Sequence, residues 1–279
     1  MKRKYSWTTL VLIFLCGSMA KASDSSTAEK QLRQDLENKV LSLRTPSASE
    51  KLQFDSAGQP VGTFLPAPWT TGGLLKVKLV SLKRGSLRID CERVLLALRA
   101  IRASSGPPVL VPLLTGRSVR LSLDLDSNLL DIDHVKAVLA KIFEEGDVQQ
   151  KIAAYWKPAP EIVPDVRSSE QGLVAGMLEG TRPVYRVKLG VVDPPKPLHA
   201  PDPEYTDEAR KKQIQGTAVL LVIVNEKGMP EILEVTKDLG DGLDLEALAA
   251  VSGWRFKPAI RAGQPVAVMI NVQVTFKLR

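Results

Sequence analysis

Two strands near the carboxyl end of the chain decide the fold, and they differ in how their apolar residues are arranged. Residues 218–224 read AVLLVIV, an apolar run without a break, and residues 225–228 (NEKG) follow as a turn whose glycine can adopt positive φ. Residues 268–276 read VMINVQVTF, in which the strongly apolar residues stand at every second position. The unbroken run predicts a strand buried on both faces or covered by a partner. The alternation predicts a long final strand with one buried face and one solvent-exposed face.

Shorter signals around these two strands predict the remaining elements of a small α+β unit. Thr206 is placed to cap a helix over residues 207–213, and residues 230–237 return as a second strand after the turn. A loop rich in Gly and Asp comes next, and residues 244–252 then carry apolar side chains at helical spacing. Trp254 begins a short extended segment that leads through a glycine turn into the final strand.

Six short motifs in this region occur in order with compatible gaps, and together they resemble the TonB C-terminal domain family. The motifs are PEYTDEA at 203–209, GTAV at 216–219, NEKG at 225–228, LDLEA at 243–247, WRFKPA at 254–259 and GQPV at 263–266. The resemblance implies a TonB C-terminal-like domain over residues 204–279, with a three-stranded antiparallel sheet and two helices. It also implies a periplasmic module that grips the TonB box of outer-membrane receptors.

In the family that these motifs resemble, the box adds as a strand beside the last strand, with help from the segment just before the motif tyrosine. A final strand with a solvent-exposed face can leave an edge of unpaired N–H and C=O groups. An extended peptide can pair with these groups by β-augmentation. We expect the apolar side chains of this strand to serve the core while their backbones serve the partner, and we expect Trp254 and Phe256 in the core. The implied partner-binding residues are Asp202, Pro203, Glu204, Tyr205, Val268, Ile270, Asn271, Val272 and Gln273.

The first 22 residues have the three-part layout of a secretory signal. Residues 2–4 (KRK) are basic, residues 7–16 are mostly apolar, and residues 20–22 (AKA) place small side chains before a cleavage site. The stretch between the flanking lysines is about 16 residues, or roughly 24 Å as a helix, which is short of the ~30 Å hydrocarbon core. We therefore expect export to the periplasm with cleavage near Ala22. The alternative is a short anchor in the inner membrane.

The basic character of the chain is largely a property of this leader. The formal net charge is +7 and the pI is about 9.4, but residues 1–22 contain four basic residues and no acid. Without them, 34 basic residues face 31 acidic ones. This balance predicts no nucleic-acid partner.

The region upstream of the C-terminal domain divides into three segments. Residues 23–71 begin with a short amphipathic helix, whose apolar stripe runs to Leu43, and continue as an irregular segment. Residues 72–156 show strands first and a helix afterwards, which predicts a separate β-rich or α+β domain of unknown function. Residues 157–203 form a Pro-rich linker with a strand at 185–192.

Proline is most frequent over residues 193–203 of this linker, where it occupies five positions. Such a composition favours an extended polyproline geometry of about 3.1 Å per residue. We therefore expect this stretch to be a spacer that separates two domains.

No set of residues predicts catalysis, a metal site or a cofactor. His134 and His199 are the only histidines, and their separation of 65 positions matches no zinc motif. Residues 124–135 begin like a calcium loop but lack its glycine and its final glutamate. Cys91 lies in an apolar run and is expected to be a small buried residue rather than a reactive thiol. We therefore predict no enzymatic activity, no cofactor and no metal.

These observations predict a periplasmic TonB-like protein that binds an outer-membrane TonB-dependent receptor through its TonB-box peptide, in transport across the cell envelope. A proton-driven motor complex of the inner membrane is a further partner if residues 1–22 are an anchor. The alternative is an envelope interaction or structural protein that uses the same domain without energy transduction, because residues 1–22 lack the histidine of the family's membrane helix. A third alternative is an exported enzyme with its site in residues 72–156. The apolar strand 218–224 is compatible with a homodimer, with docking of the amino-terminal half, or with a helix on each side.

Overall fold

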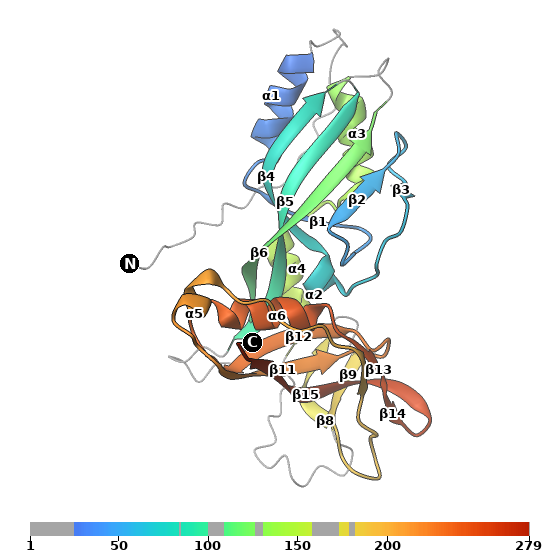
Figure 1. Ribbon diagram of the computed structural model, residues 1–279. Coiled ribbons are helices and arrows are strands. Elements are labelled where there is room, and N and C mark those ends of the chain that lie inside the picture. Colours follow the sequence, from blue (N-terminus) through green and yellow to red (C-terminus); the bar gives the residue numbers. More distant parts are fainter. Residues whose placement is uncertain are drawn as a thin grey trace.

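The computed structural model describes residues 25–83, 85–99, 109–125, 131–157, 173–178 and 182–278, so the leader predicted over residues 1–22 lies outside the described residues. Figure 1 shows an amino-terminal unit, with the helices α1 and α3, above a carboxyl-terminal unit. Within the described part of the chain, no helix has both the length and the apolar character that crossing a membrane requires.

The amino-terminal unit is built on an antiparallel meander of three long strands. Its centre is β5, which pairs with β4 on one side and β6 on the other, and β2 joins β6 in parallel. Two short strands extend the edges, since β1 pairs with β4 and β3 with β2. The strands are β1 (Val40–Ser42), β2 (Lys51–Phe54), β3 (Pro60–Val61), β4 (Leu74–Lys83), β5 (Ser86–Arg99) and β6 (Val109–Asp124).

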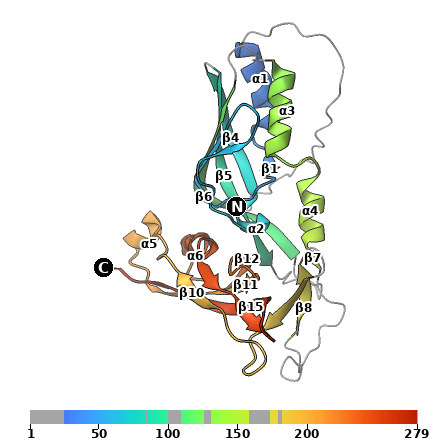
Figure 2. The same ribbon diagram turned by 90° about the vertical axis from the view of Figure 1, so that its right-hand side faces the viewer.

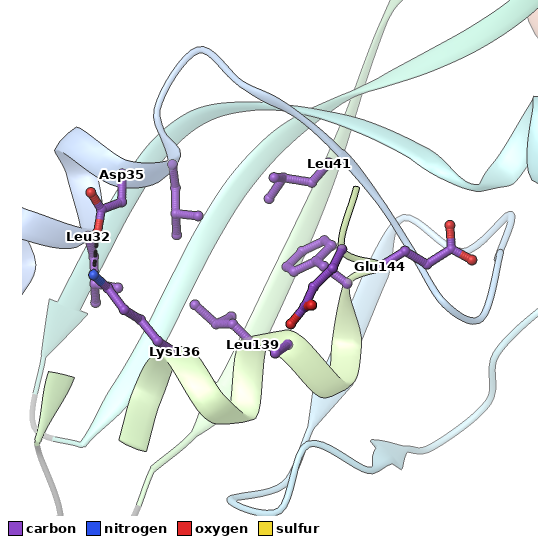
Figure 3. Close-up of a pocket in the computed structure, with 10 residues that line it drawn as sticks. Leu32, Asp35, Leu41, Lys136, Leu139 and Glu144 are labelled. Carbon is purple, nitrogen blue, oxygen red and sulfur yellow. Dashed lines mark ion pairs between the residues drawn. The ribbon is translucent and has the colours of Figure 1, made fainter. Parts of the chain in front are cut away.

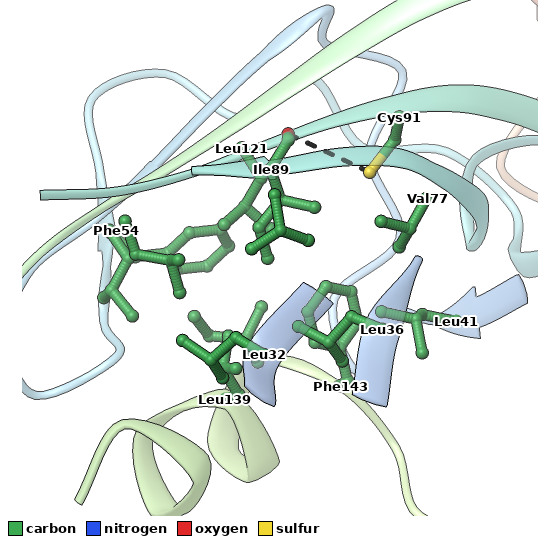
Figure 4. Close-up of a cluster of buried hydrophobic side chains, with 14 of the residues drawn as sticks. Leu32, Leu36, Leu41, Phe54, Val77, Ile89, Cys91, Leu121, Leu139 and Phe143 are labelled. Carbon is green, nitrogen blue, oxygen red and sulfur yellow. Dashed lines mark hydrogen bonds between the residues drawn. The ribbon is translucent and has the colours of Figure 1, made fainter. Parts of the chain in front are cut away.

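Two helices, α1 (Ser25–Leu36) and α3 (Ile132–Ile142), cover one face of this meander (Figure 2). The side chains between them and the strands form a mainly aliphatic core (Figure 4). Cys91 belongs to this core, and burial raises the pKa of its thiol to about 12. The expectation that Cys91 is a buried structural residue is therefore confirmed.

Polar side chains of α1, and that of Glu37 directly after it, also tie the helix to the backbone of β4. Glu29 and Glu37 accept hydrogen bonds from the backbone N–H groups of Leu82 and Val80, at 3.2 and 3.1 Å. Arg33 donates from Nε to the carbonyl of Val80 at 2.9 Å. The helix thus covers strand-edge groups that would otherwise be open to another chain.

The first helix is shorter than the apolar stripe that was predicted to run to Leu43. Helix α1 ends at Leu36, and Asn38 then adopts a left-handed backbone conformation with φ of 66°. Val40 pairs with Lys76 as part of β1, so the last positions of the stripe belong to strand structure. A spacing of three to four residues cannot show that a left-handed residue interrupts the helix.

The carboxyl-terminal unit has the predicted three-stranded antiparallel sheet with two helices. The sheet order is β12-β11-β15, and the chain enters it through α5 and crosses between β12 and β15 through α6. The short strands β13 and β14 lie between α6 and β15 in the sequence. The elements are α5 (Asp207–Lys211), β11 (Gly216–Val224), β12 (Pro230–Lys237), α6 (Leu243–Ser252), β13 (Arg255–Lys257), β14 (Ala259–Arg261) and β15 (Gln264–Phe276).

The two units share one continuous sheet. The end of β5 runs parallel to β12, with Ala97 opposite Leu233. Helices α2 (Trp69–Gly72) and α4 (Val148–Tyr155) lie at this junction, where a separate apolar cluster joins residues of both units. The cluster includes Ile223, so the upper part of β11 is buried on both faces, by α6 on one side and by the amino-terminal unit on the other.

The Pro-rich segment does not form the predicted spacer. Strand β9 (Arg182–Arg186) replaces the strand predicted at 185–192 and lies on the sheet between β15 and β8 (Leu173–Leu178), which is followed by β7 (Trp156–Lys157). Further on, β10 (Lys196–His199) pairs with β13, and Asp193 exchanges backbone hydrogen bonds with Ile260. Prolines are compatible with such extended edge positions, because an edge strand leaves one side of its backbone unpaired.

Candidate partner-binding edge

One side of the β15 backbone pairs with β11. Two hydrogen bonds show which residues of β11 face β12 and which face β15. Thr236 donates from its hydroxyl to the carbonyl of Val219 at 3.0 Å, and Asn225 donates from its backbone N–H to the carbonyl of Met229 at 2.9 Å. The Val219 carbonyl and the Asn225 N–H, on β11 or at its end, therefore both face β12. The odd-numbered residues of β11 therefore face β12, and the even-numbered ones face β15, because successive residues alternate in direction.

The same alternation fixes the direction of each residue in β15. The register is regular from Gly216 opposite Phe276 to Val224 opposite Val268, so even-numbered residues of the two strands face each other. The odd-numbered residues of β15 must therefore direct their N–H and C=O groups to the outer edge. Thr217 and Thr275 agree with this, since their hydroxyl oxygens lie 3.3 Å apart, as expected for a non-hydrogen-bonded pair with close side chains.

Part of that outer edge is open. Beyond Met269, no strand of the described residues pairs with this side of β15, which leaves the outward backbone groups of Asn271, Gln273 and Thr275 unpaired by strand structure. The side chains of these three residues are exposed, whereas Val272 is buried in the core beneath α6 and Ile270 is partly buried against it. The structure thus separates two roles along one strand. Even-numbered residues hold the fold, and odd-numbered residues offer hydrogen bonds.

The first part of the same edge is already occupied. Strand β9 runs parallel to β15 and pairs Val184, Tyr185 and Arg186 with residues 267–269. Val268, which the sequence placed in the binding set, therefore lies between β11 and β9, with its side chain fully buried. Met269 was expected on the solvent-exposed face, but its side chain is buried, with 8% of the residue exposed. The junction cluster covers that face at this end of the strand.

The segment before α5, with the other predicted binding residues, meets β15 at its far end. Tyr205 packs edge-on against Phe276, with ring centroids 5.5 Å apart, and donates from its hydroxyl to the carbonyl of Ile214 at 3.0 Å. Trp254 donates from Nε1 to the carbonyl of Pro201 at 3.1 Å, which holds the start of the segment. Trp254 is only partly buried, whereas Phe256 is in the core as expected.

Three further predicted residues of this segment differ in exposure. Asp202 and Glu204 are exposed and Pro203 is partly buried. Glu204 lies 3.8 Å from Arg117 of β6, which also approaches Glu246 of α6 at 3.7 Å. The segment therefore touches the amino-terminal unit as well as the sheet. Sequence reasoning had no signal for this contact, because its partners stand far apart in the chain.

Thr206 positions the segment by capping α5. Its hydroxyl accepts a hydrogen bond from the backbone N–H of Ala209 at 3.2 Å and donates to the carbonyl of Asp241 at 2.7 Å. We expect Thr206→Ala to lower the free energy of unfolding by about 1–2 kcal/mol, because both bonds are lost. Thr206→Ser keeps the hydroxyl and should retain most of that stability. Urea denaturation of the full chain checks the pair, and equal losses in the two variants would contradict the cap.

A buried carboxylate at the junction was not predicted from the sequence. Glu231 of β12 is 3% exposed, and its Oε1 accepts hydrogen bonds from the Tyr155 hydroxyl and from Arg182 Nη2, the latter at 3.0 Å. Arg182 also pairs with Glu226 at 3.2 Å. The guanidinium of Arg182 is partly buried, but the two carboxylates outweigh that effect and raise its pKa. This cluster joins β9, α4 and the β11–β12 hairpin.

A pocket in the amino-terminal unit lies apart from this edge. It has a volume of about 50 Å³ and opens between α1 and α3, over Leu32, Leu36 and Leu139 (Figure 3). An ion pair of 2.7 Å between Asp35 and Lys136 crosses its rim. Its lining is almost wholly apolar. Over the ranges that the structure describes, no three His, Cys, Asp or Glu side chains gather as a metal site would require.

Comparison with known proteins relates the carboxyl-terminal unit to a family. The family model described as "Gram-negative bacterial TonB protein C-terminal" matches residues 201–278. Protein tonB2 of Pseudomonas aeruginosa is 38% identical over 82 residues, covering 29% of this chain and 30% of that protein. Protein TonB of Vibrio cholerae is 34% identical over 90 residues, covering 32% of this chain and 37% of that protein. The matched segment thus spans about a third of each relative's length.

A solved structure matches part of the chain. The solution NMR structure of the Pseudomonas aeruginosa TonB CTD is 23% identical, with a TM-score of 0.26, and the match covers 34% of this chain and 95% of that one. The family model and the two relatives agree with the six motifs in the sequence. Residues 201–278 of this chain therefore match the TonB C-terminal domain family in sequence.

Proposed function

We propose that this chain is a TonB-type protein of the cell envelope that binds an extended segment of an outer-membrane transporter along the open edge of β15. The observation that supports this proposal most strongly is the row of outward backbone groups at Asn271, Gln273 and Thr275 in a TonB C-terminal domain. An extended peptide that pairs with these groups gains main-chain hydrogen bonds at every second residue.

The segment before α5 supports the same site from its other end. Tyr205 contacts Phe276, the last residue of β15, so a peptide lying along the edge would meet the exposed residues Asp202 and Glu204 near this end. The proposed binding set is therefore Asp202 to Tyr205 with Ile270, Asn271, Val272 and Gln273. We add Thr275, because its backbone groups face the same edge. In this set Ile270 and Val272 contribute through the core. Val268 lies outside the set and supports the strand from within the sheet.

Site-specific photo-crosslinking in the host cell tests the proposal. A photoreactive amino acid at Gln273 should crosslink to an outer-membrane transporter, and mass spectrometry should place the crosslink in an extended segment of that transporter. Leu79 is a matched control, because it is 45% exposed but lies on β4 in the other unit. Equal capture of the transporter from both positions, or none from Gln273, would contradict the proposal.

A further inference from the structure

Strand β9 occupies the first part of the edge that the proposed function assigns to a partner. It pairs with β15 over residues 267–269 only, in parallel, and its last residue, Arg186, stands opposite Met269. The open outward groups begin two residues later, at Asn271. The edge of β15 is therefore one continuous row, of which the chain itself fills the beginning.

A few side-chain contacts attach β9 to the neighbouring strands. Arg182, at its start, reaches Glu226 and Glu231 at 3.2 and 3.0 Å. The guanidinium of Arg261 lies over the ring of Tyr185, 4.9 Å from its centroid. Val184 is fully buried against Ala267 and Met269. The Arg182–Glu226 ion pair and the Arg261–Tyr185 contact are only partly buried, so breaking them costs little and the attachment is reversible.

We propose that β9 is a displaceable internal occupant of the partner-binding edge, and that an extended peptide gains the full length of β15 only when β9 leaves it. This inference rests on the proposed function. The incoming strand would run parallel to β15, as β9 does, and would need an apolar residue opposite Ala267 to replace Val184. Displacement would then free β9 together with β8, with which it pairs, and β8 in turn pairs with β7.

Such an occupant lowers the apparent affinity for the peptide. The measured dissociation constant equals the intrinsic one divided by the fraction of molecules whose edge is free. Any change that detaches β9 should therefore tighten binding, and any change that locks β9 should weaken it. A purely structural β9 would produce neither effect.

Two variants of one strand separate these outcomes. Arg182→Ala removes both ion pairs and should tighten binding of a fluorescent TonB-box peptide by about tenfold. Arg186→Ala is the matched control, because it removes the same charge from an exposed position that forms no ion pair within the described residues. Its affinity should equal that of the wild type. If Arg182→Ala proves unstable in a thermal melt, Glu226→Gln removes the more exposed ion pair alone and should tighten binding in the same direction.

A disulfide lock between β9 and β15 tests the opposite prediction, that binding weakens when β9 cannot leave the edge. Val184→Cys with Ala267→Cys, in a Cys16→Ser background, places two thiols on opposed positions of neighbouring strands. Strands lie about 4.7–4.9 Å apart and disulfides span Cα separations of roughly 4.4–6.8 Å, so the pair can close. The oxidised full chain should bind the peptide about tenfold more weakly than the same sample after reduction.

Hydrogen–deuterium exchange supplies a second reading. The peptide should speed the exchange of β9 amides in the wild type and in the reduced lock, and should leave them slow in the oxidised lock. Equal affinity of all variants, with β9 amides unchanged, would overturn the role of β9 and leave the edge as the binding site. A lack of binding by every variant, reduced lock included, would overturn the proposed function itself.

Discussion

Gln273→Pro should abolish tight binding of a TonB-box peptide while leaving the domain folded. The N–H of Gln273 faces the outer edge, so a proline there removes a group that the fold does not use and places a ring where the partner strand must lie. We expect at least about a tenfold loss of affinity, or roughly 1.4 kcal/mol. The melting temperature should stay within about 4 °C of the wild type. Fluorescence anisotropy with the labelled peptide and a thermal melt measure the two quantities.

Two neighbouring substitutions make this test specific to the backbone. Gln273→Ala changes the side chain but keeps the N–H, so it should bind the peptide nearly as well as the wild type. Val272→Pro instead removes an N–H that faces Leu220 on β11 and should destabilise the domain by roughly 2–4 kcal/mol. If Gln273→Pro bound normally, or if it unfolded like Val272→Pro, the assignment of inward and outward residues would be wrong.

Gly228→Ala, which adds a single methyl group, should strongly lower the free energy of unfolding of the carboxyl-terminal unit. Gly228 has φ of 74°, and a Cβ built on it would lie 1.8 Å from the carbonyl oxygen of Phe256. The same turn accepts a hydrogen bond from the N–H of Phe256 at 2.8 Å. Because the obstacle is backbone and not a mobile side chain, we expect a loss of about 4 kcal/mol or more.

Gly263→Ala is the matched control for this turn. Gly263 has a similar φ of 78°, but a Cβ there would have no atom within 4 Å. It should therefore cost only the left-handed strain, about 1–2 kcal/mol. Chemical denaturation of the two full-length variants, followed by circular dichroism, measures the difference. Similar losses would show that the backbone angle alone sets the cost, and that the close contact with β13 does not.

Local signals in the sequence predicted the elements of the carboxyl-terminal unit closely. The strand over residues 230–237 has the predicted bounds, and Thr206 caps α5 as expected. Each of these features depends on residues within one turn or one strand, where side-chain chemistry restricts the backbone directly. The shared pattern of Asn225 and Gly228 likewise predicted the turn whose glycine adopts positive φ.

The pairing of β9 with β15 could not be predicted in the same way. Its partners Tyr185 and Val268 lie more than 80 positions apart, and the bonds between strands use backbone groups that every residue carries. The burial of Met269 was missed for a related reason, because the side chains that cover it come from the other unit. Alternation in one strand shows which residues share a face, but not what covers that face.

Which residues of β15 point outward was also beyond the sequence. Alternation of side chains was visible, but the direction of the backbone groups depends on which strand lies on each side. Val272 illustrates the difference. The sequence placed it in the binding set together with Gln273, whereas the register gives its backbone to β11 and leaves that of Gln273 free.

Residue-resolved amide exchange on the full chain, with and without a TonB-box peptide, tests the central claim most directly. We predict that the peptide slows exchange at Asn271, Gln273 and Thr275, while Val272 and Val274 exchange slowly in both samples because they already face β11. Slowed exchange confined to another surface, such as the pocket between α1 and α3, with these three amides unchanged in the presence of bound peptide, would contradict it.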